Sequence, residues 1–265
     1  MPTAQLGAID LYYERAGQGA PLFFISGTGG DLRFKPNVFD GPLPKAFDLL
    51  AYDQRGLGRS AKPDIAYSMA DYADDAAALL DYIGWSTAKV IGVSFGGMVA
   101  QELVLRHPAK VERLVLACTS PGGAGGSSYP FHEVQHLKGE ERARHLIPIV
   151  DTRLDAAWMA ANPDGFAQFV AMVAADPYAG ELGREMGARR QLEARAGHDT
   201  WDRLEQIRCP VFIAAGRYDG IALPETQPKL ASRIASASLR FFEGGHGFLL
   251  QDRTALPAMV EFLNG

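Results

Sequence analysis

Ser94 lies at the centre of the sequence GVSFG, between Gly92 and Gly96. Its flanks predict a strand before it and a helix over Phe95–Arg106 after it. A serine at such a turn is held in a strained backbone conformation, and small neighbours let the strand and the helix approach closely. The pattern therefore indicates a nucleophile exposed at the carboxyl edge of a sheet. The alternative is a tight turn whose serine only caps the helix.

A serine hydroxyl is a weak nucleophile unless a base accepts its proton, and the base is usually a histidine. His246 has a suitable setting, because it lies in EGGHGF between the last predicted strand and the last predicted helix. His107 ends a helix beside Pro108, which predicts a capping role. Surface or structural roles are expected for the other histidines, His132, His136, His145 and His198.

The base needs an acid to orient it, and Asp219 is the candidate. It follows Gly216 by three residues, at the end of a predicted strand. An aspartate in that place is usually a turn residue. The chain order Ser94, Asp219, His246 favours the catalytic interpretation, because this is the order of the nucleophile, the acid and the base in one family of serine hydrolases.

Short β-branched or aromatic runs alternate with helical patterns, which is typical of an α/β fold with a mostly parallel sheet and helices on both faces. Ser68 with Asp71 forms a predicted capping box, and Gly84 ends the helix that follows. Two further helices are predicted over residues 224–234 and 254–263. The predicted strands are Leu11–Ala16, Pro21–Ser26, Phe47–Asp53, Lys89–Val93, Val111–Ala117, Val211–Gly216 and Leu239–Glu243.

The segment from 120 to 200 interrupts this alternation, because it has helical patterns and no convincing strand. We expect a helical cap inserted into a core domain formed by residues 1–119 and 201–265. The cap begins with PGGAGGSS, which predicts a flexible lead-in.

With these residues in this order, the chain resembles the α/β-hydrolase superfamily, and within it the cap-bearing branch that includes esterases, enol-lactonases and C–C hydrolases. Besides GVSFG, the sequence DQRGLGRS from Asp53 fits a structural loop of that branch, and SGTGG from Ser26 occupies the place of its oxyanion segment. The resemblance implies that the backbone N–H groups of Thr28 and Phe95 form an oxyanion hole. Ser26 stands where the family often has histidine. The oxyanion-hole donor of this segment is a backbone N–H group, so the replacement does not remove it.

The resemblance implies hydrolysis of a small, largely apolar ester or lactone through an acyl-enzyme, with no cofactor and no metal. Hydrolysis of C–C bonds in the meta-cleavage products of aromatic rings and cofactor-free perhydrolysis are alternatives, because these enzymes share the catalytic groups. A small-molecule receptor on a hydrolase fold is the non-enzymatic alternative.

Aromatic side chains are the candidates for the substrate pocket. Phe131, Trp158 and Phe169 lie in the cap, and Phe248 lies beside His246. The cap holds eleven acidic and eight basic side chains. This composition gives no support for a substrate with several negative charges.

Composition limits the other function classes. The 265 residues are 47% hydrophobic with a net charge of −5, which argues against nucleic-acid binding. The sequence shows neither an export signal nor an 18-residue apolar stretch, so we expect a cytoplasmic protein without membrane contact. Cys118 and Cys209 are expected to be free thiols. The oligomeric state does not follow from the sequence.

Overall fold

The computed structural model describes residues 2–265, which contain one sheet of eight strands in the order β1-β2-β4-β3-β5-β6-β7-β8. The pairs β1–β2 and β2–β4 are antiparallel, and all other neighbours are parallel. This confirms the predicted α/β class with a mostly parallel sheet. The strands are β1 (Thr3–Gln5), β2 (Asp10–Ala16), β3 (Pro21–Ile25), β4 (Asp48–Tyr52), β5 (Ala88–Val93), β6 (Val111–Ala117), β7 (Val211–Gly216) and β8 (Ala237–Phe242).

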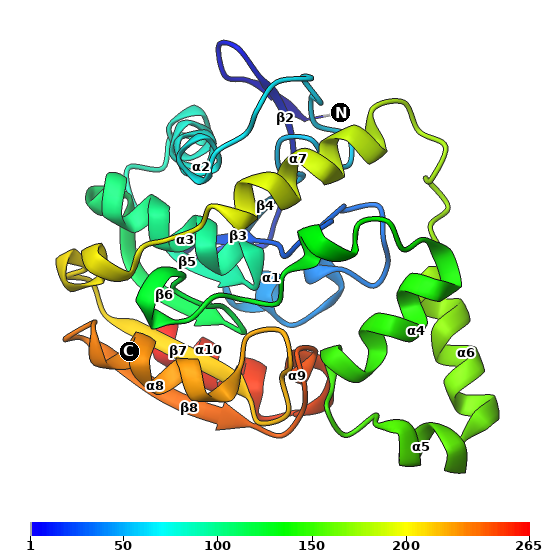
Figure 1. The fold of residues 1–265 in the computed structure, drawn as a ribbon. Helices are drawn as coiled ribbons and strands as arrows, with labels where there is room; N and C mark the ends of the chain where they lie inside the picture. The colour runs from blue at the N-terminus through cyan, green and yellow to red at the C-terminus, as the bar shows by residue number, and fades with distance from the viewer. Residues whose placement is uncertain (1) are drawn as a thin grey trace.

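Helices cover both faces of the sheet (Figure 1). Side chains alternate between the faces along each strand. In β5, for example, Val90 joins the apolar cluster under α2 and α3, whereas Ile91 joins the cluster under α10. The helices of this core are α1 (Leu43–Ala46), α2 (Met69–Ile83), α3 (Phe95–Arg106), α8 (Gln227–Ser232), α9 (Phe248–Gln251) and α10 (Ala255–Asn264).

Local sequence signals set the bounds of α2 as predicted. Ser68 caps its N-terminus in a capping box with Asp71, and Gly84 ends it with φ +81°. The loop after β4 is also fixed by the residues that the family pattern indicated. Its Asp53 carboxylate accepts hydrogen bonds from the backbone N–H groups of Leu32 and Arg59, at 2.7 and 2.9 Å.

Between β6 and β7 the chain forms four α-helices and contributes no strand to the sheet. In Figure 1, α4, α5 and α6 project to one side of the sheet, and α7 crosses near β3 and β4. We propose that residues 120–200 form a cap on this core. The helices are α4 (Gly139–Val150), α5 (Ala156–Ala161), α6 (Pro163–Ala174) and α7 (Arg184–Ala196). The 3₁₀ helices of the chain are η1 (Val38–Asp40), η2 (Pro108–Lys110), η3 (Gly123–Gly125), η4 (Phe131–Val134), η5 (Trp201–Gln206) and η6 (Pro224–Thr226).

The glycine-rich start of this segment is a packed turn and not the flexible lead-in that its composition predicts. Gly122 forms isolated bridges to Gly126 and Asp199. It has φ +74°, and a Cβ there would lie 2.0 Å from the carbonyl oxygen of His198. Glycine is therefore required by backbone geometry and close approach, which composition alone does not distinguish from flexibility.

None of the helices in residues 2–265 combines the length and the apolar character needed to cross a membrane.

Candidate active site

Ser94 lies at the sharp turn between β5 and α3. Its backbone has φ +56° and ψ −117°, which is a strained conformation for a residue with a side chain. The turn depends on its neighbours, because a Cβ on Gly92 would lie 2.4 Å from the carbonyl oxygen of Gly96. A Cβ on Gly96 would lie 2.1 Å from the carbonyl oxygen of Ile25. The two glycines thus allow the close packing that holds the serine at the sheet edge.

His246 faces Ser94 from the loop after β8. Its Nε2 lies 2.8 Å from Ser94 Oγ, and its Nδ1 lies 2.8 Å from Asp219 Oδ2. A carboxylate can only accept, so Nδ1 carries the proton and Nε2 is left to accept the hydrogen bond from the serine hydroxyl. The structure therefore brings the three predicted residues together in one hydrogen-bonded series.

Backbone hydrogen bonds hold the Asp219 carboxylate in place, independently of its contact with His246. Its side chain is fully buried, and Oδ1 accepts hydrogen bonds from the backbone N–H groups of Ile221 and Ala222 at 2.8 and 2.9 Å. Oδ2 is thereby left to face Nδ1 of His246. Such an arrangement can hold the imidazole in one orientation and stabilise it when it becomes positively charged.

The loop after β3 places Thr28 beside Ser94. The backbone N–H groups of Thr28 and Phe95 donate no hydrogen bond to any other group in residues 2–265. Two glutamines hold this loop. Gln54 donates to the Ser26 carbonyl at 2.7 Å, and the Gly29 N–H donates to Gln191 at 2.9 Å. Polar side chains from the β4 loop and from α7 thus secure the segment in which Ser26 replaces the family's histidine.

A contact that the sequence did not indicate joins the cap to both catalytic loops. The end of α4 accepts two backbone hydrogen bonds, from Gly220 to Ile149 at 3.0 Å and from His246 to Val150 at 2.6 Å. Gln251 adds a side-chain link, because it accepts from the Gly245 N–H at 2.8 Å and donates to Asp151 at 2.9 Å. The backbone part of this contact has no signature in the sequence, since any residue can supply a carbonyl.

A cavity of about 300 Å³ opens above the serine and the histidine. Val93, Phe131 and Ile221 give it apolar walls, and two arginines from the cap, Arg142 and Arg195, give it charge. The residues that line it are Gly27, Thr28, Val93, Ser94, Phe131, Arg142, Arg195, Ile221 and His246.

Of the four aromatic residues predicted for the pocket, Phe131 lines this cavity and three do not. Trp158 lies in α5 and is half-exposed. Phe169 packs between α4 and α6 in a small apolar cluster with Ile147 and Val170. The side chain of Phe248 points into the sheet core, where it stacks on Phe242 with ring centroids 5.4 Å apart. The prediction for Phe248 rested on its closeness to His246 in the sequence. That closeness does not decide side-chain direction, and Phe248 packs in the apolar cluster of the core instead of the cavity.

Cys118 does not compete with Ser94 as a nucleophile. Cys118 and Cys209 are both free, as predicted, and burial raises the pKa of the Cys118 thiol well above its usual range. Within residues 2–265, no group of three or more His, Cys, Asp or Glu side chains could hold a metal ion.

Comparison with known proteins gives the class to which this fold and site belong. The sequence matches the alpha/beta hydrolase fold family over residues 20–252. The chain therefore belongs to that family, and it is a hydrolase.

Particular relatives are similar over most of the chain. A poly(3-hydroxyalkanoate) depolymerase of Ectopseudomonas oleovorans is 30% identical over 92% of this chain and 84% of its own. A putative carbamate hydrolase, RutD, of Caulobacter sp. (strain K31) is 31% identical over 98% of both chains. The crystal structure of the enol-lactonase from Burkholderia xenovorans LB400 superimposes over the full length of both chains, with a TM-score of 0.79 and 26% identity.

Proposed function

We propose that the protein is a serine hydrolase that cleaves a small ester or lactone, largely apolar in its body, through an acyl-enzyme. The observation that carries this proposal is the hydrogen-bonded series Ser94–His246–Asp219 at the floor of the cavity. A serine that merely capped α3 would bond to the helix backbone, whereas Ser94 makes no side-chain capping bond.

In the first step, Ser94 Oγ attacks the carbonyl carbon of the substrate while His246 Nε2 takes the hydroxyl proton. The Asp219 carboxylate stabilises the imidazolium that forms. The backbone N–H groups of Thr28 and Phe95 receive the oxyanion, because both lie beside Ser94 and have no other partner among residues 2–265. His246 then gives its proton to the leaving oxygen, and the acyl group stays on Ser94.

In the second step, His246 takes a proton from water, and the resulting hydroxide attacks the acyl carbonyl. The tetrahedral intermediate is held by the same two N–H groups, and the proton returns to Ser94 Oγ as the acid leaves. A lactone follows the same course with one difference. Its alcohol stays part of the acyl chain on Ser94, and water then releases the whole chain as a hydroxy acid.

The volume of the cavity supports a small substrate, and one structural neighbour supports a lactone. A volume of about 300 Å³ is at the lower end of ligand pockets and is too small for a folded protein. The enol-lactonase among the structural neighbours supports the lactone part of the proposal by its name.

The proposal is tested with a fluorophosphonate and a substrate panel. The phosphonate should label Ser94 alone, as read by peptide mass spectrometry, and 4-nitrophenyl esters of two to eight acyl carbons should be hydrolysed beside simple lactones. Labelling of another residue would overturn the assignment. A ring-fission dienone cleaved far faster than any ester would replace ester hydrolysis by C–C hydrolysis, and binding of these compounds without turnover would indicate a receptor.

A further inference from the structure

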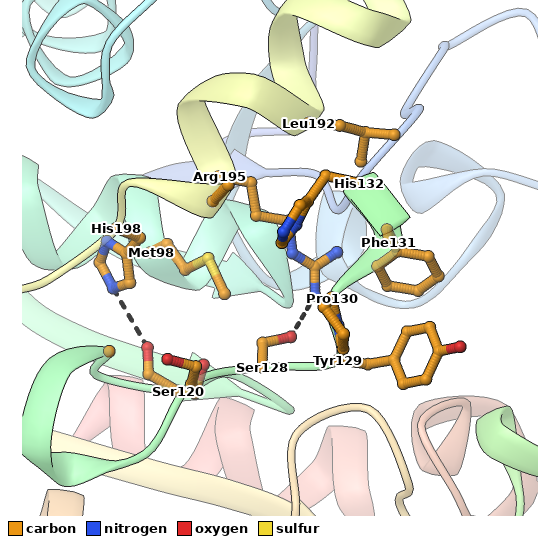
Figure 2. Close-up of a pocket in the computed structure, with 13 residues that line it drawn as sticks. Met98, Ser120, Ser128, Tyr129, Pro130, Phe131, His132, Leu192, Arg195 and His198 are labelled. Carbon is orange, nitrogen blue, oxygen red and sulfur yellow. Dashed lines mark hydrogen bonds between the residues drawn. The ribbon is translucent and has the colours of Figure 1, made fainter. Parts of the chain in front are cut away.

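Arg195 lies in the last turn of α7 and reaches the cavity wall. The residue is 6% exposed, and its guanidinium donates to the hydroxyl of Thr28 at 2.9 Å and to the hydroxyl of Ser128. Figure 2 shows the side chain descending from α7 toward Ser128 and Phe131. It lines both the cavity above Ser94 and a neighbouring cavity of about 100 Å³. One side of the guanidinium therefore faces the space that a substrate would fill.

This buried guanidinium has no carboxylate partner within residues 2–265, in contrast to the other arginines of α7. Arg184 pairs with Asp31 and Asp176, and both Arg189 and Arg190 pair with Glu193. The two partners of Arg195 are neutral hydroxyls, which satisfy two of its five N–H groups and none of its charge.

Arg142, from α4, is a second arginine at this cavity and is partly buried. It also lines the space above Ser94 and forms no ion pair within the described chain. The guanidinium carbons of Arg195 and Arg142 lie 4.4 and 6.0 Å from the centroid of the Phe131 ring. Two unpaired cations thus share one aromatic wall.

The guanidinium groups of Arg195 and Arg142 remain charged at neutral pH. Burial lowers the pKa of Arg195 to about 10, with the negative charge of Asp219 opposing the shift, and burial also lowers the pKa of Arg142. A pKa near 10 still leaves Arg195 protonated at neutral pH. Burying a charge without a partner of opposite sign is unfavourable, so buried charges in proteins are normally paired.

We propose that the substrate carries a carboxylate that Arg195 binds, with Arg142 adding to the positive field of the cavity. This inference rests on the proposed hydrolytic function and adds the charge of the substrate to it. A carboxylate matches the planar fork of a guanidinium and pairs with it more strongly than a hydroxyl does. The acidic excess of the cap does not oppose this, because the acids are absent from the cavity lining.

The rival explanation is that Arg195 only holds the oxyanion loop through the hydroxyl of Thr28. That role would affect every ester equally. It also leaves Arg142 unexplained, because the Arg142 side chain makes no hydrogen bond within residues 2–265. The two explanations differ in one measurable quantity, which is the preference for an anionic ester over a neutral ester of the same length.

The experiment compares mono-4-nitrophenyl adipate with 4-nitrophenyl hexanoate, after subtraction of spontaneous hydrolysis. The wild type should favour the anionic ester in kcat/KM by about tenfold or more, and Arg195→Met should reduce that ratio by on the order of 10- to 100-fold. Arg195→Lys should retain part of the preference, because the charge remains. Arg189→Met, on the exposed face of the same helix, is the matched control and should leave the ratio unchanged.

A wild-type ratio of one or less would overturn the proposal, and so would equal losses on both esters in Arg195→Met. If Arg195→Met does not fold, Arg142→Met tests the same ratio and should lower it by about threefold to tenfold.

A binding measurement separates this proposal from the proposed function. Monomethyl adipate should bind to Ser94→Ala by calorimetry about tenfold more tightly than dimethyl adipate, and Arg195→Met in that background should abolish the difference. Equal binding of the two esters would contradict the anionic substrate even if the wild type hydrolyses esters. Selective binding without turnover by the wild type would contradict hydrolysis and leave the anion site standing.

Discussion

The sheet edge and the cap contribute to the same cavity in different ways. At the edge, backbone geometry determines which residues can stand there, as the positive φ of Ser94 and the close approach at Gly92 and Gly96 show. In the cap, helices pack through interchangeable apolar side chains, and only the assembled fold decides which of them face the cavity. At the sheet edge the motif GVSFG reports the backbone constraint in the sequence, whereas residues constrained only by packing have no such motif.

The largest expected effect concerns the sheet edge. If Asp219 and His246 act as one unit, His246→Ala should lower kcat by on the order of 10⁴- to 10⁶-fold, and adding Asp219→Ala should cost less than about threefold more. The reason is that an aspartate without an imidazole to orient has no catalytic role. Steady-state kinetics with an activated ester measures this. If the kcat losses of the two single variants multiplied in the double variant, Asp219 would act independently of His246. The hydrogen bond between them would then not explain the role of Asp219.

A second prediction separates cap residues that line the cavity from those that do not. Phe131→Ala enlarges the cavity, so acyl preference should shift toward longer chains by about tenfold in relative kcat/KM. Trp158→Ala is the matched control and should leave the preference unchanged, because Trp158 lies in α5 away from the cavity. The ester panel gives the readout. A shift caused by Trp158→Ala would place α5 over the cavity and contradict the assignment of the wall.

A smaller effect is expected where the two regions meet. Gln251→Ala removes the link between the Gly245 N–H and Asp151, so the His246 loop should be held less firmly. We expect a loss of about threefold to tenfold in kcat and a Tm lower by about 2 to 4 °C. Gln168→Ala, on the exposed face of α6, should change neither quantity. An unchanged kcat for Gln251→Ala would mean that the backbone contacts of Ile149 and Val150 suffice.

The smallest effect is a pH dependence of stability near the end of the cap. Burial lowers the pKa of His198 to about 4 from 6.5, with Glu102 opposing the shift. Between these values the unfolded chain binds a proton that the folded protein does not, so stability should fall as pH falls from 6.5 toward 4. Denaturant unfolding across this range should show a shallower slope for His198→Asn. Exposed His136→Asn should not change it, and equal slopes for the wild type and His198→Asn would contradict the prediction.

Most of the fold could be predicted because its signals are local. The strands β6 and β7 have the predicted bounds, and the capping box of α2 is read directly from Ser68 and Asp71. The three-residue strand β1 was missed, since so short a segment carries no period and depends on pairing with β2. Trp158 and Phe169 were indistinguishable from cavity residues, because helical spacing does not tell which apolar face meets which neighbour.

The unpaired charge of Arg195 could not be predicted for a related reason. The sequence around α7 holds several arginines, and the net charge of the cap only sums them with its acidic residues. Whether a given arginine is paired depends on contacts such as that between Arg184 and Asp31, which are 153 residues apart in the chain. Charge balance in a segment thus says little about the charge that faces a cavity.

Ser94 is expected to carry the acyl group during turnover. The direct measurement is rapid acid quenching of the wild type with 4-nitrophenyl hexanoate, followed by peptide mass spectrometry. We expect a hexanoyl group on Ser94 that forms with a burst of nitrophenol, decays at the rate of turnover and is absent from Ser94→Ala. Undiminished turnover by Ser94→Ala, or an acyl group that forms and decays at turnover rate on another residue, would contradict the assignment of Ser94 as the nucleophile.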